Sequence, residues 1–309
     1  MKTIDILSVG ELLIDFIGHE ENASINSTNN YQRFLGGSPT NVAVNASRLS
    51  LRSMLVAACG KDGLGDFAVE KLKENKVDVS GLKQIDNEPT SVILVSKTTE
   101  TPDFVSFRQT DFQITEDQLT DNVLSSSSVF HTTCFALSKN PSRQTILNRA
   151  KKAKALGLEL SIDLNYSEKI WPNREEAHRV IKEYMSNAPL LKLSNDDCER
   201  LFAEKKSETY IFDFFHNLGA KTICLTKGDQ GVVVSDLEKG LITQHALKIE
   251  KVKDATGAGD AFWTGFLFAQ INNYSLENCI KIAQKLAAIK LQSVGQLPKD
   301  VDILAEILA

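Results

Sequence analysis

Apolar and polar residues recur in the second half of the chain with two different periods. Short segments rich in apolar residues predict strands at 158–163, 190–193 and 222–226, and apolar residues three or four positions apart predict helices near 175–187, 210–218 and 276–293. A further helix is predicted over 142–156, with Ser142 as its cap and Gly157 at its end. The alternation predicts a parallel sheet with helices on both faces, and in such sheets chemistry lies beyond the carboxyl ends of the strands.

The first 110 residues follow a less regular pattern. A buried strand is predicted at 6–9. The apolar segments 90–96 and 104–108 flank a polar turn at 97–103, which predicts a hairpin. Such a hairpin either extends the main sheet or covers a site as a lid.

Composition and charge exclude several classes of protein. The 309 residues are 42% hydrophobic and carry a net charge of −5, so nucleic acid is not expected as a partner. No apolar stretch approaches the length of a membrane span, and the N-terminus lacks a signal-peptide core. The five scattered cysteines form no Cys-x-x-Cys pair, which is typical of reduced thiols. We therefore expect a cytoplasmic protein that does not bind a membrane.

Two glycine clusters carry the candidate chemistry. The segment 254–260, Asp-Ala-Thr-Gly-Ala-Gly-Asp, precedes an apolar helix, so its turn would direct backbone N–H groups to an anion at a helix N-terminus. Asp260 would then take a proton beside a phosphate, although from these residues alone it could equally be a helix cap. The segment 36–43 would let a ligand approach the backbone, with Asn41 suited to a polyol, or it is only a turn before a helix. Asp15, just after the first strand, could accept hydrogen bonds from sugar hydroxyls or be a turn residue.

These motifs together resemble the ribokinase-like (PfkB) carbohydrate kinase family, and most closely its fructokinases. Walker and Rossmann glycine motifs are absent from the sequence. The family's segments match here at 36–43, 60–66, 163–166 with Trp171, 192–197, 225–231 and 254–260. The resemblance implies a three-layer α/β fold with a mostly parallel sheet, as one domain over 1–309. It also implies a small β lid built from about 12–35 and 90–110, which would keep water from the reactive phosphate.

The resemblance implies a role for each matched position. Asp260 would be the base, and Gly257, Ala258 and Gly259 would form the anion hole. The expected sugar contacts are Asp15, Gly36, Gly37, Asn41, Asn165 and, from the lid, Arg108. The expected ATP contacts are Lys192, Ser194, Thr226, Gly228, Gly231 and Ala288. Asp197 would contact Mg²⁺ through water, and Asp254 and Thr256 would contribute to a monovalent-cation site, with K⁺ as the candidate ion. Lid strands would pair two subunits in a homodimer.

Two departures from the family pattern bear on how efficiently the enzyme would work. Position 167 is Ser where the family often has Arg, with Lys169 as the available replacement, and Asp197 is one methylene shorter than the usual Glu. The leading hypothesis is ATP-dependent phosphorylation of free fructose at its 6-hydroxyl. Ribokinase and 2-keto-3-deoxygluconate kinase are the alternatives, although a sugar acid needs cations and Arg33 and Arg108 are the only arginines expected near the site. A non-catalytic sugar-binding member is the alternative from another class.

Overall fold

The computed structural model describes residues 2–97 and 103–309. Its strands are β1 (Ile4–Val9), β2 (Leu13–Glu21), β3 (Tyr31–Gly36), β4 (Ser53–Gly60), β5 (Leu82–Ile85), β6 (Val92–Lys97), β7 (Phe104–Phe107), β8 (Ser127–Thr133), β9 (Glu159–Asp163), β10 (Leu190–Ser194), β11 (Thr222–Thr226), β12 (Val232–Asp236) and β13 (Gly240–Gln244). Its α-helices are α1 (Ser38–Arg48), α2 (Gly63–Glu74), α3 (Asp121–Ser125), α4 (Ser142–Ala155), α5 (Arg174–Met185), α6 (Asn195–Phe202), α7 (Glu208–Leu218), α8 (Ala258–Ile271), α9 (Leu276–Leu291) and α10 (Ile303–Leu308). Short 3₁₀ turns are η1 (Glu116–Gln118), η2 (Ala136–Ser138) and η3 (Gly228–Gln230).

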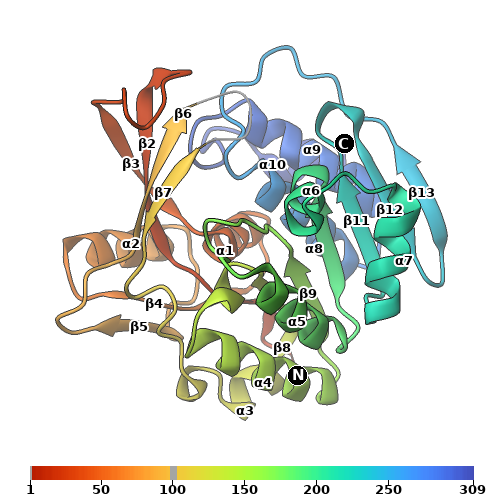
Figure 1. Ribbon diagram of the computed structural model, residues 1–309, viewed down its shortest axis with the longest axis horizontal. Helices are drawn as coiled ribbons and strands as arrows, with labels where there is room; N and C mark the ends of the chain where they lie inside the picture. Colours follow the sequence, from red (N-terminus) through yellow and green to blue (C-terminus); the bar gives the residue numbers. More distant parts are fainter. Residues whose placement is uncertain (1, 98–102) are drawn as a thin grey trace.

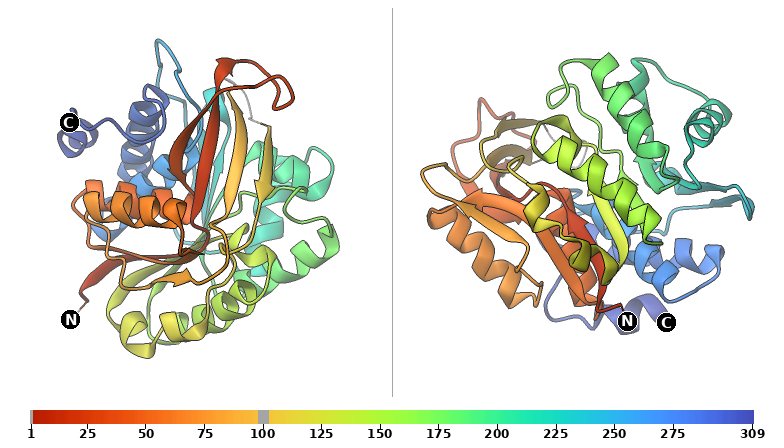
Figure 2. Two further views of the ribbon diagram at one scale, coloured as in Figure 1. Left: turned by 90° about the vertical axis from the view of Figure 1, so that its left-hand side faces the viewer. Right: turned by 90° about the horizontal axis from the view of Figure 1, so that it is seen from below.

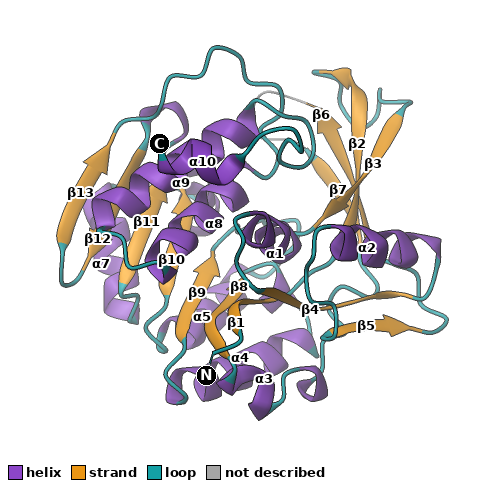
Figure 3. Ribbon diagram, turned by 180° about the vertical axis from the view of Figure 1, so that it is seen from behind, coloured by secondary structure: helices purple, strands orange, loops and turns teal. Residues whose placement is uncertain are grey.

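The described strands form two sheets. The larger sheet has the order β13-β12-β11-β10-β9-β8-β1-β4-β5, parallel from β11 to β5 with β12 and β13 antiparallel at one edge (Figure 1). Helices cover both of its faces, with α4, α5 and α7 on one side and α1, α8 and α9 on the other (Figures 1 and 3). The expected three-layer α/β fold with a mostly parallel sheet is confirmed.

The two faces of the sheet are buried in separate apolar clusters. Side chains of a strand alternate between faces, so Ile6 of β1 packs in the cluster of α8 and α9, whereas Leu7 and Val9 pack in the cluster of α4 and α5. Trp263 and Phe266 of α8 are fully buried and stack with ring centroids 5.0 Å apart. This core fixes the N-terminus of α8 near the carboxyl ends of the strands.

The smaller sheet projects from the main body in the order β3-β2-β6-β7 (Figure 2). It includes the predicted hairpin, since β6 and β7 pair antiparallel, and residues 98–102 of its predicted turn lie outside the described residues. The sequence pattern indicated β6 and β7 directly, whereas β2 and β3 were expected only from the resemblance. This sheet fits the lid over the site.

One local prediction from the sequence is wrong. Ser142 does not cap α4: Pro141 holds the N-cap position, and Ser142 is the first helical residue, whose hydroxyl donates to Ala136 O at 2.9 Å. Backbone N–H of Ser142 also donates, to Phe112 O at 3.0 Å, so both donors of this serine bind segments that precede the helix. Within the described part of the chain, no helix combines the length and apolarity needed to cross a membrane.

Candidate active site

The strand order reverses at β1, which lies between β8 and β4. Connections leave such a point in opposite directions, so a crevice opens beyond the carboxyl ends of the strands. Glu11 follows β1, Thr133 ends β8 and Asp163 ends β9. Backbone N–H of Ser38, in the first turn of α1, donates to Glu11 Oε1 at 3.3 Å, which attaches that helix to the same edge.

The Asp260 carboxylate lies between the first turns of α1 and α8. Ser38 Oγ donates to Asp260 Oδ1 at 2.7 Å, and Asn41 Nδ2 donates to Oδ2 at 2.8 Å. The N-cap of α8 is Gly257, in the left-handed region with φ 75°, so the alternative that Asp260 caps this helix is wrong. Both helix dipoles have their positive ends near this carboxylate, which favours negative charge there.

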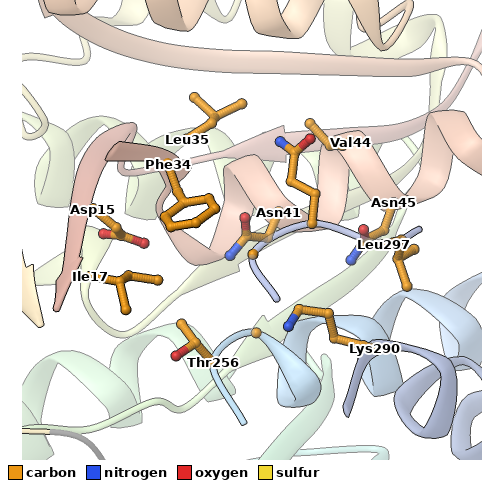
Figure 4. Close-up of a pocket in the computed structure, with 13 residues that line it drawn as sticks. Asp15, Ile17, Phe34, Leu35, Asn41, Val44, Asn45, Thr256, Lys290 and Leu297 are labelled. Carbon is orange, nitrogen blue, oxygen red and sulfur yellow. The ribbon is translucent and has the colours of Figure 1, made fainter. Parts of the chain in front are cut away.

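Asp15 and the N-terminal glycines form the sugar side of the site. A Cβ on Gly36 would lie 2.2 Å from Asp15 Oδ2, and one on Gly37 would lie 2.3 Å from the backbone oxygen of Glu11. Asp15 and Asn41 line one pocket together with Thr256, Gly257 and other residues (Figure 4). Burial, followed by the charges of Asp260 and Asp254, raises the pKa of Asp15 to about 7.

The predicted anion hole is the Gly257–Ala258–Gly259 turn. Backbone N–H of Ala258 already donates to Ala255 O at 3.2 Å. A Cβ on Gly259 would lie 2.8 Å from Lys192 Nζ, so this ammonium lies against the backbone of the turn. The turn therefore has a fixed positive charge beside it as well as the positive end of the α8 dipole.

Lys192, predicted as an ATP contact, forms a buried ion pair. Its Nζ lies 2.9 Å and 3.0 Å from the two carboxylate oxygens of Asp163, and the two side chains are 8% and 2% exposed. Burial opposes the charge of the ammonium, but the carboxylates of Asp163 and Asp197 outweigh it and raise the pKa of Lys192. The ammonium is thus held charged beside Gly259.

The remaining predicted ATP contacts lie at the carboxyl ends of β10 and β11 and on α9. Ser194 caps α6 by accepting from backbone N–H of Asp197 at 3.1 Å. Thr226 ends β11, and Gly228 and Gly231 of the loop after it have φ of 57° and 98°. A Cβ on Gly231 would lie 2.1 Å from Gln244 O, so the loop requires glycine there. Ala288 is half-buried on α9, and contact of all these residues with ATP stays a prediction.

Asp197, predicted for Mg²⁺, completes the capping box of α6. Its Oδ2 accepts from Ser194 N at 2.8 Å and from Ser194 Oγ at 2.7 Å. Asp197 therefore fills the position that Glu or Gln usually holds in a capping box. Lys169, the proposed replacement for the missing Arg, forms an ion pair with Asp103 next to β7 instead of entering the site.

Two predicted sugar contacts bind protein atoms in this structure. Arg108 Nε lies 2.8 Å from Asp111 Oδ2, its Nη1 donates to Ser138 Oγ at 2.6 Å, and its side chain is 5% exposed. Asn165 Oδ1 accepts from backbone N–H of Phe135 at 3.2 Å. Arg108 is therefore anchored at the base of the lid, and its contact with a sugar stays a prediction, as does that of Asn165.

Sequence reasoning missed three residues of the site. Ser38 lies inside the 36–43 motif, yet its bond to Asp260 depends on the packing of α1 against α8. Glu11 is buried, accepts from Thr133 Oγ1 at 2.7 Å, and has a pKa raised to about 8 by burial. Lys290 is buried beside Asp254. It lies seven residues after Ala283 on the apolar face of α9, and this position could have indicated that the lysine is buried.

A carboxylate between two helix N-termini, with glycine amides beside it, can support phosphoryl transfer to a hydroxyl. The chain belongs to the pfkB family of carbohydrate kinases, whose family model matches residues 3–300. The protein is therefore a sugar kinase that acts on a small sugar and ATP, and the resemblance seen in its motifs is confirmed.

Three relatives illustrate the range of the family. An ATP-dependent 6-phosphofructokinase of Thermoanaerobacterium thermosaccharolyticum is 32% identical over 302 residues, covering 98% of this chain and 92% of the relative. The structure of Halothermothrix orenii fructokinase has a TM-score of 0.80 and 32% identity, and the match covers 95% of this chain and 100% of that one. A Pyrococcus horikoshii sugar kinase in complex with ATP has a TM-score of 0.84 and 26% identity, covering 98% and 99% of the chains.

Proposed function

We propose that the protein transfers the γ-phosphoryl group of ATP to the primary hydroxyl of a free sugar, converting fructose to fructose 6-phosphate. The observation that carries this proposal is the Asp260 carboxylate, held by Ser38 and Asn41 between the first turns of α1 and α8. Asp260 would accept the proton of the sugar hydroxyl, while the 257–259 turn and Lys192 stabilise the charge of the transferred group. Magnesium bound to ATP would neutralise phosphate charge. Asp197 Oδ2 is occupied by the cap of α6, so we do not propose it as a contact of the magnesium.

Fructose is favoured by the likeness to the Halothermothrix orenii fructokinase and by the scarcity of free cations near the sugar side. In the described part of the chain, Lys290 is the one cationic side chain lining the Asp15 pocket, and it is paired with Asp254. Arg33 lies over the Phe67 ring at 3.8 Å, on an exposed part of β3. These placements argue against a sugar acid such as 2-keto-3-deoxygluconate.

A second candidate is phosphorylation of fructose 6-phosphate at its other primary hydroxyl. It is favoured by the 32% identity to the 6-phosphofructokinase over nearly the whole chain. The substrate of that reaction carries a phosphate, which needs cations that the pocket lining does not offer unpaired. We therefore place free fructose first.

The experiment is a panel of acceptors at matched concentration: fructose, ribose, 2-keto-3-deoxygluconate and fructose 6-phosphate, with ADP release as the readout. The position of the new phosphate would be assigned by ³¹P NMR. Highest kcat/KM for fructose supports the proposal, and highest kcat/KM for fructose 6-phosphate replaces it with the second candidate. If none of the four gives sugar-dependent ADP release, the alternative of a non-catalytic sugar-binding member replaces both.

A substitution of Asp260 tests its proposed role as the base. Asp260→Asn should retain binding of sugar and ATP by calorimetry, while kcat falls by about 10²–10⁴-fold. Asp213→Asn, an exposed carboxylate on α7, is the matched control and should leave kcat unchanged. Full activity of Asp260→Asn would rule out its role as the base.

The homodimer through the lid stays a proposal. It is supported by β7, an edge strand on which Val105 and Phe107 are 42% and 55% exposed. Sedimentation of the wild type and of Phe107→Ser would test it, and a monomeric wild type would reject it. Location in the cytoplasm likewise stays a prediction from the sequence.

A further inference from the structure

Lys290 ends in a buried position between two loops that flank the anion hole. Its side chain is 4% exposed, and its Nζ lies 3.4 Å from Asp254 Oδ2 and 3.4 Å from Ser293 O. The same side chain reaches the turn, since its Cε would lie 3.6 Å from a Cβ on Gly257 (Figure 4). The ammonium therefore joins the segment before α8 to the segment after α9.

Asp254 is the anionic partner of this ammonium. Its Oδ1 accepts from backbone N–H of Thr256 at 2.9 Å, and its Oδ2 accepts from backbone N–H of Gly295 at 3.0 Å. The carboxylate is 9% exposed, so without a cation it would be a poorly solvated negative charge. Three contacts to Asp254 therefore hold the 254–257 turn: the Lys290 ammonium and the backbone N–H groups of Thr256 and Gly295.

The monovalent-cation site predicted at Asp254 and Thr256 does not fit these placements. The ammonium of Lys290 already lies against Asp254, and both carboxylate oxygens accept hydrogen bonds from backbone N–H groups. A metal ion at the same carboxylate would be repelled by the ammonium at close range. The residues around Asp254 therefore do not fit a bound K⁺ ion.

We propose that Lys290 is a tethered monovalent cation, which positions the anion-hole turn through Asp254 and makes the kinase independent of added K⁺. Lys290 is a positioning residue on this view, because it acts through the 254–257 turn and not on the sugar. The activity readouts below rest on the proposed kinase function, whereas the melting readout does not.

The test compares the wild type with Lys290→Ala and Lys290→Met in KCl, NH₄Cl, NaCl and tetramethylammonium chloride at equal ionic strength. The wild type should have the same kcat and the same melting midpoint in all four salts. Lys290→Ala, which opens space for an ion, should lose kcat on the order of tenfold or more in sodium, because a buried carboxylate is left unpaired beside the turn. Potassium or ammonium should restore its kcat and raise its melting midpoint.

Two variants act as controls. Lys290→Met fills the space without a charge, so it should lose kcat and respond to none of the ions. Lys281→Ala removes an exposed lysine from the same helix and should behave as the wild type.

Three results would overturn the proposal. The first is a wild type whose kcat rises several-fold with potassium over sodium. The second is a Lys290→Ala variant that keeps full kcat in sodium. The third is a Lys290→Ala variant that no cation rescues and that changes only the sugar KM, because Lys290 would then be a sugar contact. Should the kinase prove inactive on every sugar, selective stabilisation of Lys290→Ala by potassium still decides the question.

Discussion

The Lys192–Asp163 pair allows stability and catalysis to be separated in one experiment. The two groups form a bidentate contact at 2.9 Å and 3.0 Å and are nearly excluded from solvent. At this separation and an effective dielectric constant of about 20, the attraction is roughly 6 kcal/mol. Removing one partner leaves the other charge buried, which typically costs about 3–5 kcal/mol. Lys192→Met should therefore lower the free energy of unfolding by about that amount, as measured by urea denaturation.

The double variant Lys192→Met/Asp163→Asn should recover most of that stability, because the carboxylate paired with Lys192 is replaced by a neutral amide. The amide oxygen introduced by Asp163→Asn would still accept the hydrogen bond that Asn165 N donates to Asp163 Oδ1 at 3.2 Å. Together with the single variant Asp163→Asn, these variants form a double-mutant cycle that gives the coupling energy of the pair.

Catalysis should not recover in the double variant. The ammonium lies against Gly259, so an anion bound to that turn would be about 5 Å away, where one charge stabilises another by about 3 kcal/mol at the same dielectric constant. That energy corresponds to a fall in kcat on the order of 10²-fold. The assay is sugar-dependent ADP release at saturating ATP and sugar. A double variant with both wild-type stability and wild-type kcat would refute the reasoning, since Lys192 would then serve only to neutralise Asp163.

Three further outcomes are expected. Gly36→Ala places a methyl group against the Asp15 carboxylate, so the sugar KM should rise while the ATP KM stays constant, and steady-state kinetics with each substrate varied checks both. The pKa of Glu11 is raised to about 8, so its contribution to stability is present at low pH and is lost as pH rises through the window from about 4.5 to 8. Glu11→Gln should therefore flatten the pH dependence of the free energy of unfolding by at most about 1.4 kcal/mol per pH unit, and an unchanged profile would contradict burial as the cause. Arg108→Ala should destabilise the fold by about 3–5 kcal/mol by leaving Asp111 unpaired, and a rise in sugar KM beyond that of Asp111→Asn would show that Arg108 also reaches the sugar.

The sequence predicted the layers of the fold and the two glycine motifs because both depend on local pattern. The apolar-rich segments 190–193 and 222–226 form buried strands, and their pattern predicts this without knowledge of which strands they pair with. Gly219 ends α7 at the predicted residue. Glycine was needed at Gly37 and Gly257 because both adopt positive φ. These features are readable without knowing how the elements pack.

The partners of the site residues could not be predicted, because they depend on how distant elements pack. Asp260 and Ser38 are 222 positions apart, and their hydrogen bond exists only because α1 and α8 pack with their N-termini together. Lys192 and Arg108 were expected to reach ligands, yet buried carboxylates at Asp163 and Asp111 bind them. Those pairings follow from the register of the sheet and from the loops at the switch point.

The balance of charge at the site bears on the choice between a free and a phosphorylated sugar. Two ammonium groups, Lys192 and Lys290, lie near the anion hole, and each is paired with its own carboxylate. Two further carboxylates, Asp15 and Asp260, remain without a cationic partner among the described ion pairs of the chain, and Asp260 is the proposed base. A second phosphate would therefore enter a region that holds two carboxyl groups without a paired cation, whereas sugar hydroxyls would donate to these same oxygens. This balance of charge supports the proposal of a neutral polyol as substrate, and it places free fructose ahead of fructose 6-phosphate despite the 32% identity to a 6-phosphofructokinase.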